Sequence, residues 1–469
     1  MLLSLDRNSA LPLTRQIYQA IRDQILDGRL RAGTKLPSSR ELAQELGVSR
    51  NVVMIAYELL IAEGYLEGSH GSGTFVNSGA LWEMPAATPP EPAPPRDHRP
   101  QLIDFRSGFP DLASVPRSVW AKLTHRALLD APESVFGYDA PEGRLELREA
   151  IARHLSQTRG VNCDPERILI TSGSVQGLAL IAKTLLPEFR RVIVEDPTNP
   201  DIVRIFTVPG VAIEPVDCDQ NGIRTDRLPI AGGPALISVT PSHQFPLGGI
   251  LPISRRIDLV RYARETASYI LEDDYDSEIR YDGPPVAAVQ GMDPDRVIYL
   301  GTFSKILFPS LRLGYLALPG KLVGKSRAVK RLSDMHSNSV NQLALAAYLR
   351  EGLLARHIRR MKKIYRKRRD CLINALQTQF GSTVRVLGTS TGIHLVAEFS
   401  DLRFTREWME EAAKNGVRVY PVEPAVSERP EPVNRLILGY GHLSEEQIAE
   451  GILRLGNLSS SLAPNSLKK

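Results

Sequence analysis

The chain has 469 residues, 42% of them hydrophobic and 24% charged, which is the composition of a folded globular protein of more than one domain. No apolar run is long enough to cross a membrane, and the start of the chain turns polar at Asp6, too early for a secretion signal, so we expect a cytoplasmic protein. The net charge of +5 permits nucleic-acid binding without requiring it. The three cysteines, Cys163, Cys218 and Cys371, form no C-x-x-C pair, which predicts neither disulfides nor a metal centre.

Proline content divides the chain. Residues 79–100 hold seven prolines in 22 positions, which indicates an extended linker with a reach of about 70 Å. This linker separates a small domain of residues 1–78 from a large domain of residues 101–458. The polar residues 459–469 are expected to form a disordered tail.

The small domain is predicted to contain three helices and a wing. An apolar stripe at every fourth position from Ile17 to Ile25 indicates the first helix. A short helix within residues 37–47 and a third helix from Ser49 are joined by a tight turn, which is a helix-turn-helix pattern. The alternating segments 65–67 and 74–76 flank a glycine-rich tip and predict a two-stranded wing.

This pattern favours DNA binding. The first residues of the second helix of such a motif enter the major groove, and arginine and asparagine suit base edges there. Small helical units of this kind also bind only proteins, and the eight basic residues of this domain are balanced by eight acidic ones. The candidate DNA contacts, from both helices and the wing tip, are Arg40, Ser49, Arg50, Asn51, His70 and Gly71.

The large domain alternates β-branched runs with helical segments, which predicts an α/β domain with a mainly parallel sheet. A polar cluster follows each run, at the C-terminal end of the predicted strand. Ligands of open α/β sheets bind at the edge where these strand ends lie. We therefore expect the clusters to surround one site. The five runs are residues 168–170, 192–194, 236–239, 269–271 and 297–300.

Four features of these clusters fit pyridoxal phosphate when they occur together, although each alone is ordinary. The turn at residues 172–174 precedes a helix and offers N–H groups to a phosphate. Asp273 can keep a pyridine nitrogen protonated. Lys305 can form a Schiff base with an aldehyde, and Tyr275 can hydrogen-bond a ring hydroxyl.

The residues also carry a family resemblance over the whole chain. The run LPSSRELAQELGVSRNVVMIAYELLIAEGYLEGSHGSGTFV resembles the winged helix-turn-helix of GntR-type transcription regulators. The strings ITSGSVQGL, TPSHQFPLGG, LEDDYDSEIRYDG and VIYLGTFSKILFPSLRLGY resemble MocR-like regulators, which fuse that head to an aminotransferase-like body. The resemblance implies an N-terminal winged helix-turn-helix, a Pro-rich linker and an α/β fold-type I aminotransferase-like domain that binds pyridoxal phosphate.

Residue roles follow from the resemblance. It implies that Lys305 is the Schiff-base lysine, that Asp273 pairs with the pyridine nitrogen and that Tyr275 bonds the ring hydroxyl. Tyr138 would reach the phosphate of the neighbouring subunit, which requires a homodimer, and the long linker permits a head-to-tail arrangement. The full cofactor-binding set is Ser174, Val175 through its backbone, Tyr138, His243, Asp273, Tyr275, Thr302, Lys305 and Arg312.

The sequence departs from the family pattern at several positions. Asn199 replaces an aromatic that stacks on the cofactor, and Ile437 replaces an arginine that binds the substrate carboxylate. Arg435 lies two residues before Ile437 on the same strand face, so it is either a substitute or a surface arginine. Arg204 and His243 are further candidates for contacting an effector.

A strongly basic run lies in the second half of the large domain. Residues 359–369 carry eight positive charges in eleven positions. Such a run is either a solvated helix face or a track for DNA phosphates, in which case affinity falls steeply with salt.

We expect a pyridoxal-phosphate-dependent transcription regulator that binds double-stranded operator DNA and senses a small amine or amino acid. Two alternatives stay open. The chain is an active aminotransferase with an attached DNA-binding domain, or pyridoxal phosphate itself is the signal. The missing arginine at position 437 argues against efficient transamination and favours sensing over catalysis.

Overall fold

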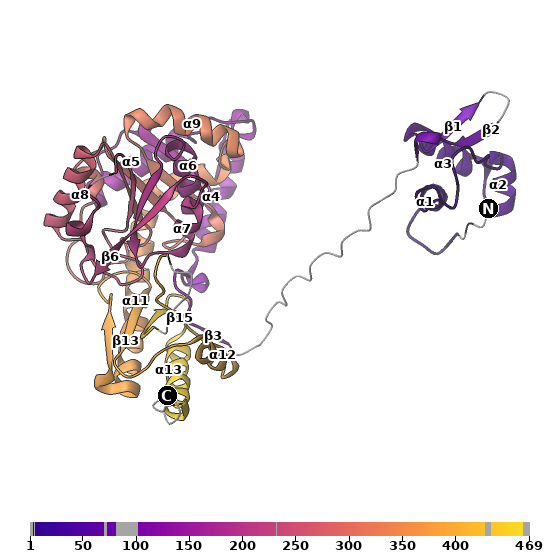
Figure 1. Ribbon diagram of the computed structural model, residues 1–469. Coiled ribbons are helices and arrows are strands. Elements are labelled where there is room, and N and C mark those ends of the chain that lie inside the picture. Colours follow the sequence, from indigo (N-terminus) through magenta and orange to yellow (C-terminus); the bar gives the residue numbers. More distant parts are fainter. Residues whose placement is uncertain are drawn as a thin grey trace. The chain divides into compact units, whose positions relative to one another are not determined.

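The computed structural model describes residues 3, 5–69, 73–80, 102–230, 232–426 and 433–462 (Figure 1). The chain divides into two compact units, Met1–His98 and Arg99–Lys469. Of the predicted linker, only residues 79 and 80 lie within the described ranges.

The N-terminal unit is a three-helix fold with a two-stranded antiparallel wing. Ser38 caps α2 and shares a reciprocal capping box with Glu41, while Gly47 takes the left-handed conformation that ends this helix. Ile17, Val53 and other apolar side chains from all three helices and both strands form its core. The elements are α1 (Leu13–Leu26), α2 (Ser39–Leu46), α3 (Arg50–Ala62), β1 (Leu66–Ser69) and β2 (Gly73–Val76), as predicted.

The large unit is built on an eight-stranded sheet with the order β4-β11-β10-β9-β8-β5-β6-β7. Strands β10, β9, β8, β5 and β6 pair in parallel, and β11 is antiparallel to both of its neighbours. All five predicted runs lie in the sheet, so the polar clusters that follow them meet at one edge. The strands are β4 (Ile168–Thr171), β5 (Arg191–Asp196), β6 (Ala212–Asp219), β7 (Gly222–Ile223), β8 (Leu236–Val239), β9 (Tyr269–Asp274), β10 (Val297–Thr302) and β11 (Gly314–Ala317).

Helices surround this sheet (Figure 1). Side chains of α6 and α9 share one apolar cluster with β10 and β11, and those of α8 share another with β8 and β9. Gly177 allows α6 to lie close to β10, because a Cβ there would be 2.5 Å from Leu300 Cδ1. The helices are α4 (Arg117–Asp130), α5 (Leu145–Arg159), α6 (Ser174–Leu185), α7 (Pro200–Phe206), α8 (Ile253–Glu265), α9 (Gly320–Asp334) and α10 (Ser339–Arg350).

A second, smaller sheet lies toward the C-terminus, with the order β12-β13-β16-β15, all antiparallel. The short strand β3 (Ile103–Asp104) pairs with β14 (Val417–Arg418), so the start of the large unit is built into its C-terminal part. The elements are α11 (Leu353–Phe380), β12 (Val384–Leu387), β13 (His394–Phe399), α12 (Arg406–Lys414), β15 (Tyr420–Pro421), β16 (Arg435–Gly439) and α13 (Glu445–Leu462).

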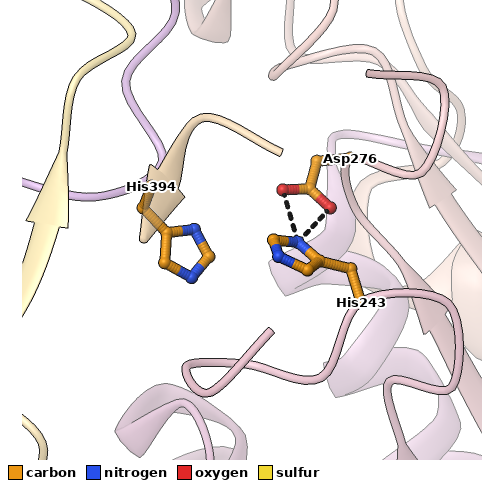
Figure 2. A group of neighbouring side chains, drawn as sticks. All are labelled: His243, Asp276 and His394. Carbon is orange, nitrogen blue, oxygen red and sulfur yellow. Dashed lines mark hydrogen bonds and ion pairs between the residues drawn. The ribbon is translucent and has the colours of Figure 1, made fainter. Parts of the chain in front are cut away.

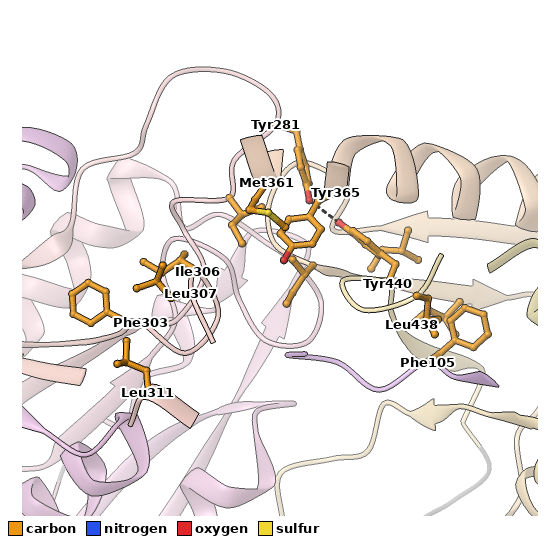
Figure 3. Close-up of a cluster of buried hydrophobic side chains, with 14 of the residues drawn as sticks. Phe105, Tyr281, Phe303, Ile306, Leu307, Leu311, Met361, Tyr365, Leu438 and Tyr440 are labelled. Carbon is orange, nitrogen blue, oxygen red and sulfur yellow. Dashed lines mark hydrogen bonds between the residues drawn. The ribbon is translucent and has the colours of Figure 1, made fainter. Parts of the chain in front are cut away.

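One apolar cluster ties this C-terminal part to the large sheet (Figure 3). It contains Phe303, from the loop after β10, and Met361 and Tyr365 from α11. Tyr281 and Tyr440 join it, and their hydroxyl oxygens lie 3.3 Å apart. The helix α11 is therefore fixed to the body that carries the strand-end clusters.

The predicted tail begins too early. Helix α13 continues to Leu462, because Ser459 and Ser460 donate their hydroxyls to the carbonyls of Leu455 and Gly456 within the helix. The polar serines are thus satisfied in a helix, and residues 463–469 lie outside the described ranges. None of the helices in the described part of the chain combines the length and apolar sequence that a bilayer crossing requires.

Candidate functional site

A cavity of about 310 Å³ lies where the strand ends of the large sheet meet the segment around Gly108. Three of its wall segments follow β4, β9 and β10. Five residues of the predicted cofactor set line it, namely Ser174, Val175, Asp273, Tyr275 and Lys305.

Lys305 follows β10 and points its amine at the N-terminal segment of the large unit. Its Nζ donates to the carbonyl of Gly108 at 2.7 Å. Burial lowers the pKa of Lys305. The carboxylates of Asp276 and Asp273 oppose that change, and the positive charge of Arg106 adds to it. A lowered pKa increases the share of unprotonated amine, which is the nucleophilic form.

Asp273 and Asp274 end β9 and point to opposite sides of the strand. Asp274 accepts hydrogen bonds from Arg159 Nε at 2.8 Å and from the Tyr299 hydroxyl. Burial acts to raise the pKa of Asp274, but the charge of Arg159 holds it below its usual range. Burial and the neighbouring Asp274 raise the pKa of Asp273 to about 7. Among the described residues, Asp273 Oδ1 is buried without a hydrogen-bond partner, so the cavity lacks a donor at this oxygen.

The start of α6 has the geometry of a phosphate site. Ser174 and Val175 open this helix and line the cavity, so its unpaired N–H groups lie at the wall. Arg312 donates to the carbonyl of Ser172, and a Cβ on Gly173 would lie 3.0 Å from its guanidinium. Glycine at this position, with φ +91°, therefore lets a cation reach the start of the helix.

The remaining predicted phosphate contacts lie near the cavity wall or outside it. Thr302 is buried, donates to Ser304 Oγ at 3.1 Å and accepts from the Ser304 N–H at 3.2 Å. Tyr138 is 85% exposed and its ring meets His336 edge-on, so it does not line the cavity of its own chain.

A buried polar cluster adjoins the cavity (Figure 2). His243 Nδ1 lies 2.9 and 3.0 Å from the carboxylate oxygens of Asp276 and 3.0 Å from the Tyr275 hydroxyl. The His243 ring also stacks on Tyr275, with ring centroids 5.8 Å apart. His394 binds the Pro246 carbonyl through Nε2, and burial lowers its pKa to about 3.

The side chains of this cluster could either bind a metal ion or hydrogen-bond to one another. One ligand atom from each of His243, Asp276 and His394 lies within 4.8 Å of the others. The sequence analysis predicts no metal centre from the spacing of the cysteines, and these three residues come from separate segments of the chain. The hydrogen bonds assign His243 to Asp276, and the pair positions the Tyr275 ring at the cavity wall.

Three further residues line the cavity. Arg106 lines the cavity and lies over the Phe109 ring at 5.0 Å. Phe245 lines it too and meets the Tyr275 ring edge-on at 6.1 Å. Asn199 lies in the wall but uses its side chain to cap α7, so no aromatic ring occupies that position. The run that contains His243 and Phe245 was a usable signal, whereas Arg106 had none.

Neither arginine predicted to contact an effector lines this cavity. Arg435 pairs with Glu398 on the adjacent strand β13 at 2.6 Å. Arg204 is exposed and pairs with Asp201 at 3.1 Å. This geometry favours the surface interpretation of Arg435, and Ile437 packs in an apolar cluster with Val396.

The basic run 359–369 has two kinds of residue. Arg366 donates to the carbonyl of Tyr281, Arg368 pairs with Asp111 at 3.1 Å, and Arg369 pairs with Asp282. These three arginines anchor α11 to the rest of the unit. The other exposed residues of the run are Arg359, Arg360, Lys363 and Lys367, and Arg366 is exposed although it is anchored.

The N-terminal unit exposes its predicted DNA contacts. Arg40, Ser49, Arg50 and Asn51 are all exposed at the junction of α2 and α3. Ser49 precedes α3 without a side-chain capping bond, and Arg50 Nε donates to Ser39 Oγ at 3.2 Å. His70 and Gly71 lie outside the described residues.

Comparison with known proteins matches both units. Residues 13–76 match the bacterial regulatory proteins of the gntR family, and residues 100–452 match aminotransferase class I and II. The chain is 38% identical to the HTH-type transcriptional regulator YdeL of Bacillus subtilis, over 96% of this chain and 97% of that one. It is 34% identical to the "Probable rhizopine catabolism regulatory protein MocR" of Rhizobium meliloti, over 96% and 94%. It is 35% identical to the pyridoxine biosynthesis regulator PdxR of Corynebacterium glutamicum, over 84% and 85%.

Solved structures match the large unit. The multiple substrate aminotransferase of Thermococcus profundus has a TM-score of 0.70 and 27% identity, over 78% of this chain and 92% of that one. The α-aminoadipate aminotransferase LysN of Thermus thermophilus, in complex with N-(5'-phosphopyridoxyl)-L-leucine, has a TM-score of 0.70 and 27% identity, over 77% and 93%. The chain belongs to the MocR-like regulators, GntR-type transcription regulators that carry an aminotransferase-like domain.

Proposed function

We propose that this regulator binds pyridoxal phosphate and that its DNA binding responds to a small amine or amino acid. The observation that carries the proposal is the unpartnered, buried Asp273 Oδ1 in the same cavity as Lys305. A protonated ring nitrogen would supply the donor that this oxygen lacks. The phosphopyridoxyl ligand of the Thermus aminotransferase, which has the same fold, supports this choice of cofactor.

The chain's residues fit the parts of this cofactor. Asp273 would hold the ring nitrogen, Tyr275 the ring hydroxyl, and Lys305 the aldehyde carbon. The phosphate would lie at the start of α6, near Thr302 and Arg312, with Tyr138 contributed by the second subunit of a homodimer. When bound, pyridoxal phosphate supplies an aldehyde that can exchange a lysine amine for the amine of a small molecule.

Lys305 and Asp273 then have separate tasks. A positive ring nitrogen favours the ionised form of Asp273, so the carboxylate would keep its charge despite burial. The Gly108 carbonyl provides a hydrogen-bond acceptor for the Lys305 amine whenever that amine is released. An effector changes DNA binding only through its different affinities for two states of the protein, and the release of Lys305 distinguishes those states.

DNA binding is assigned to the N-terminal unit. Ser49, Arg50 and Asn51 would contact base edges and Arg40 the backbone, with His70 and Gly71 approaching at the wing. Lys305→Ala is expected to bind a DNA fragment selected by the full-length protein as tightly as wild type, without any response to amines. Lys321→Ala, at an exposed position on α9, is the control. A Lys305→Ala protein that still responds would overturn the sensing mechanism.

Catalysis is the second candidate, because the cavity holds a half-buried lysine with a lowered pKa. The apolar surroundings of Ile437 argue against binding an α-carboxylate at the usual position, and the full-length relatives are regulators. Steady formation of keto acid from a supplied amino acid would establish transamination. A DNA affinity that differs between protein with and without pyridoxal phosphate, and is unchanged by amines, would instead identify the cofactor as the signal.

A further inference from the structure

The large unit contains a second cavity, of about 440 Å³, that shares no lining residue with the cavity around Lys305. It lies among α5, the end of α10, the start of α11 and the loop that follows β9. Part of its wall is apolar and comes from helices, with side chains of Ala150, Leu349, Leu354 and Ile358. This volume is within the usual range for small-molecule sites.

Most of the cationic side chains that line the same cavity form no ion pair. Within the described ranges, five cationic side chains in its wall form neither an ion pair nor a hydrogen bond, and the Nε atom of Arg280 is buried with no partner. Burial lowers the pKa of Lys362, and the nearby Arg280 adds to that change although Glu278 opposes it. The five side chains are Arg153, Arg280, Arg350, Arg359 and Lys362.

The other charged groups in the wall already have partners. Glu278 is the one carboxylate among the lining residues, and His154 Nε2 lies 2.9 Å from its oxygen. Arg159 also lines the cavity, but its guanidinium is bound to Asp274 and Ser242. The net charge of the side chains that line the second cavity is therefore strongly positive. Like charges gathered at a partly buried surface repel each other.

We propose that this cavity binds a small amphipathic anion, a carboxylate with an aliphatic or aromatic body. The anionic group neutralises the unpaired cations, and the apolar body covers the walls from α5, α10 and α11. The concave, apolar wall distinguishes this site from a phosphate track, because duplex DNA contacts exposed surface. The exposed side of α11, with Lys363 and Lys367, lies outside the cavity lining.

Isothermal titration calorimetry of the full-length protein with octanoate tests the proposal. Octanamide has the same body without the charge, and octylamine carries the opposite charge. We expect octanoate to bind with a dissociation constant below about 1 mM, at least about tenfold tighter than octanamide, with no binding of octylamine. Equal binding of octanoate and octanamide, or no binding of octanoate, would overturn the proposal.

Matched variants locate the site. The double variant Arg280→Gln/Lys362→Gln is expected to weaken octanoate binding by about tenfold or more. Arg153→Gln/Arg359→Gln replaces exposed lining residues, so it should also weaken octanoate binding without changing the half-buried Arg280 and Lys362. Lys363→Gln/Lys367→Gln removes two charges from the exposed side of α11 and should leave binding unchanged. Octanoate binding that only this control weakens would assign the anion to the outer surface and contradict the proposal.

Discussion

The two cavities of the large unit differ in how the fold assembles them. The cavity around Lys305 collects many of its side chains at the ends of parallel strands, where Asp273, Tyr275 and Lys305 belong to short polar runs. The second cavity collects Arg153, Lys362 and their neighbours from helix faces. The ion pair between Arg159 and Asp274 links the two linings, since Arg159 lines the second cavity and Asp274 adjoins Asp273. Strand ends converge by topology, whereas helix faces meet only through packing.

The largest expected effect comes from the residues between the cavities. Asp274→Asn leaves the buried guanidinium of Arg159 without its counter-ion, which should lower the free energy of unfolding by about 3 to 5 kcal/mol. Urea denaturation followed by circular dichroism measures this loss. Asp273→Asn is the matched control and should cost little in the cofactor-free protein, because Oδ1 has no partner to lose. Equal losses for the two variants would contradict the division of roles between the adjacent carboxyls.

Asp273→Asn should instead weaken cofactor binding. Loss of a charged hydrogen bond to the ring nitrogen is expected to cost about 1.5 to 3 kcal/mol, or roughly tenfold to a hundredfold in affinity for pyridoxal phosphate. Absorbance titration with the cofactor measures the change, and Asp370→Asn at an exposed position is the control. Unchanged affinity in Asp273→Asn would remove the carboxylate from the cofactor site.

The anchored and the exposed residues of the basic run on α11 should differ in how much they contribute to the free energy of unfolding. Arg368→Gln breaks the pair with the buried Asp111 and a bond to the Gly441 carbonyl, so it should lower the free energy of unfolding by about 2 kcal/mol. Lys367→Gln on the exposed side should change it by less than about 0.5 kcal/mol. Thermal unfolding of both variants tests this, and similar small effects would restore the interpretation of the whole run as a solvated face.

A further expected effect depends on pH. Burial raises the pKa of Glu195 from 4.5 to about 8, so the folded protein keeps this proton while the unfolded chain has already released it. The contribution of this group to the free energy of unfolding therefore falls as the pH rises from 4.5 to 8, by at most about 1.4 kcal/mol per pH unit, and is constant above that window. Glu195→Gln should gain stability relative to wild type across the same window. A difference that stays constant with pH would contradict the raised pKa.

The sequence motifs predicted where the cavity lies better than they predicted the contacts of individual side chains. The runs around Lys305 and Asp273 predicted the sheet and the place of the cavity, because strand ends of a parallel sheet share one edge. His394 and Arg106 line the same cavity from segments without a motif, so only the packing of the smaller sheet brings them there. The alternation that made Arg435 one candidate substitute was correct for the strand face, but its partner Glu398 on β13 was not visible from sequence.

Borohydride reduction of the purified protein after incubation with pyridoxal phosphate, followed by peptide mass mapping, tests the central claim most directly. We predict one phosphopyridoxyl group, attached to the peptide that contains Lys305, and none in Lys305→Ala. A protein that stays unlabelled with cofactor in excess, or one labelled at surface lysines such as Lys321 instead of Lys305, would contradict the assignment of the cavity to pyridoxal phosphate.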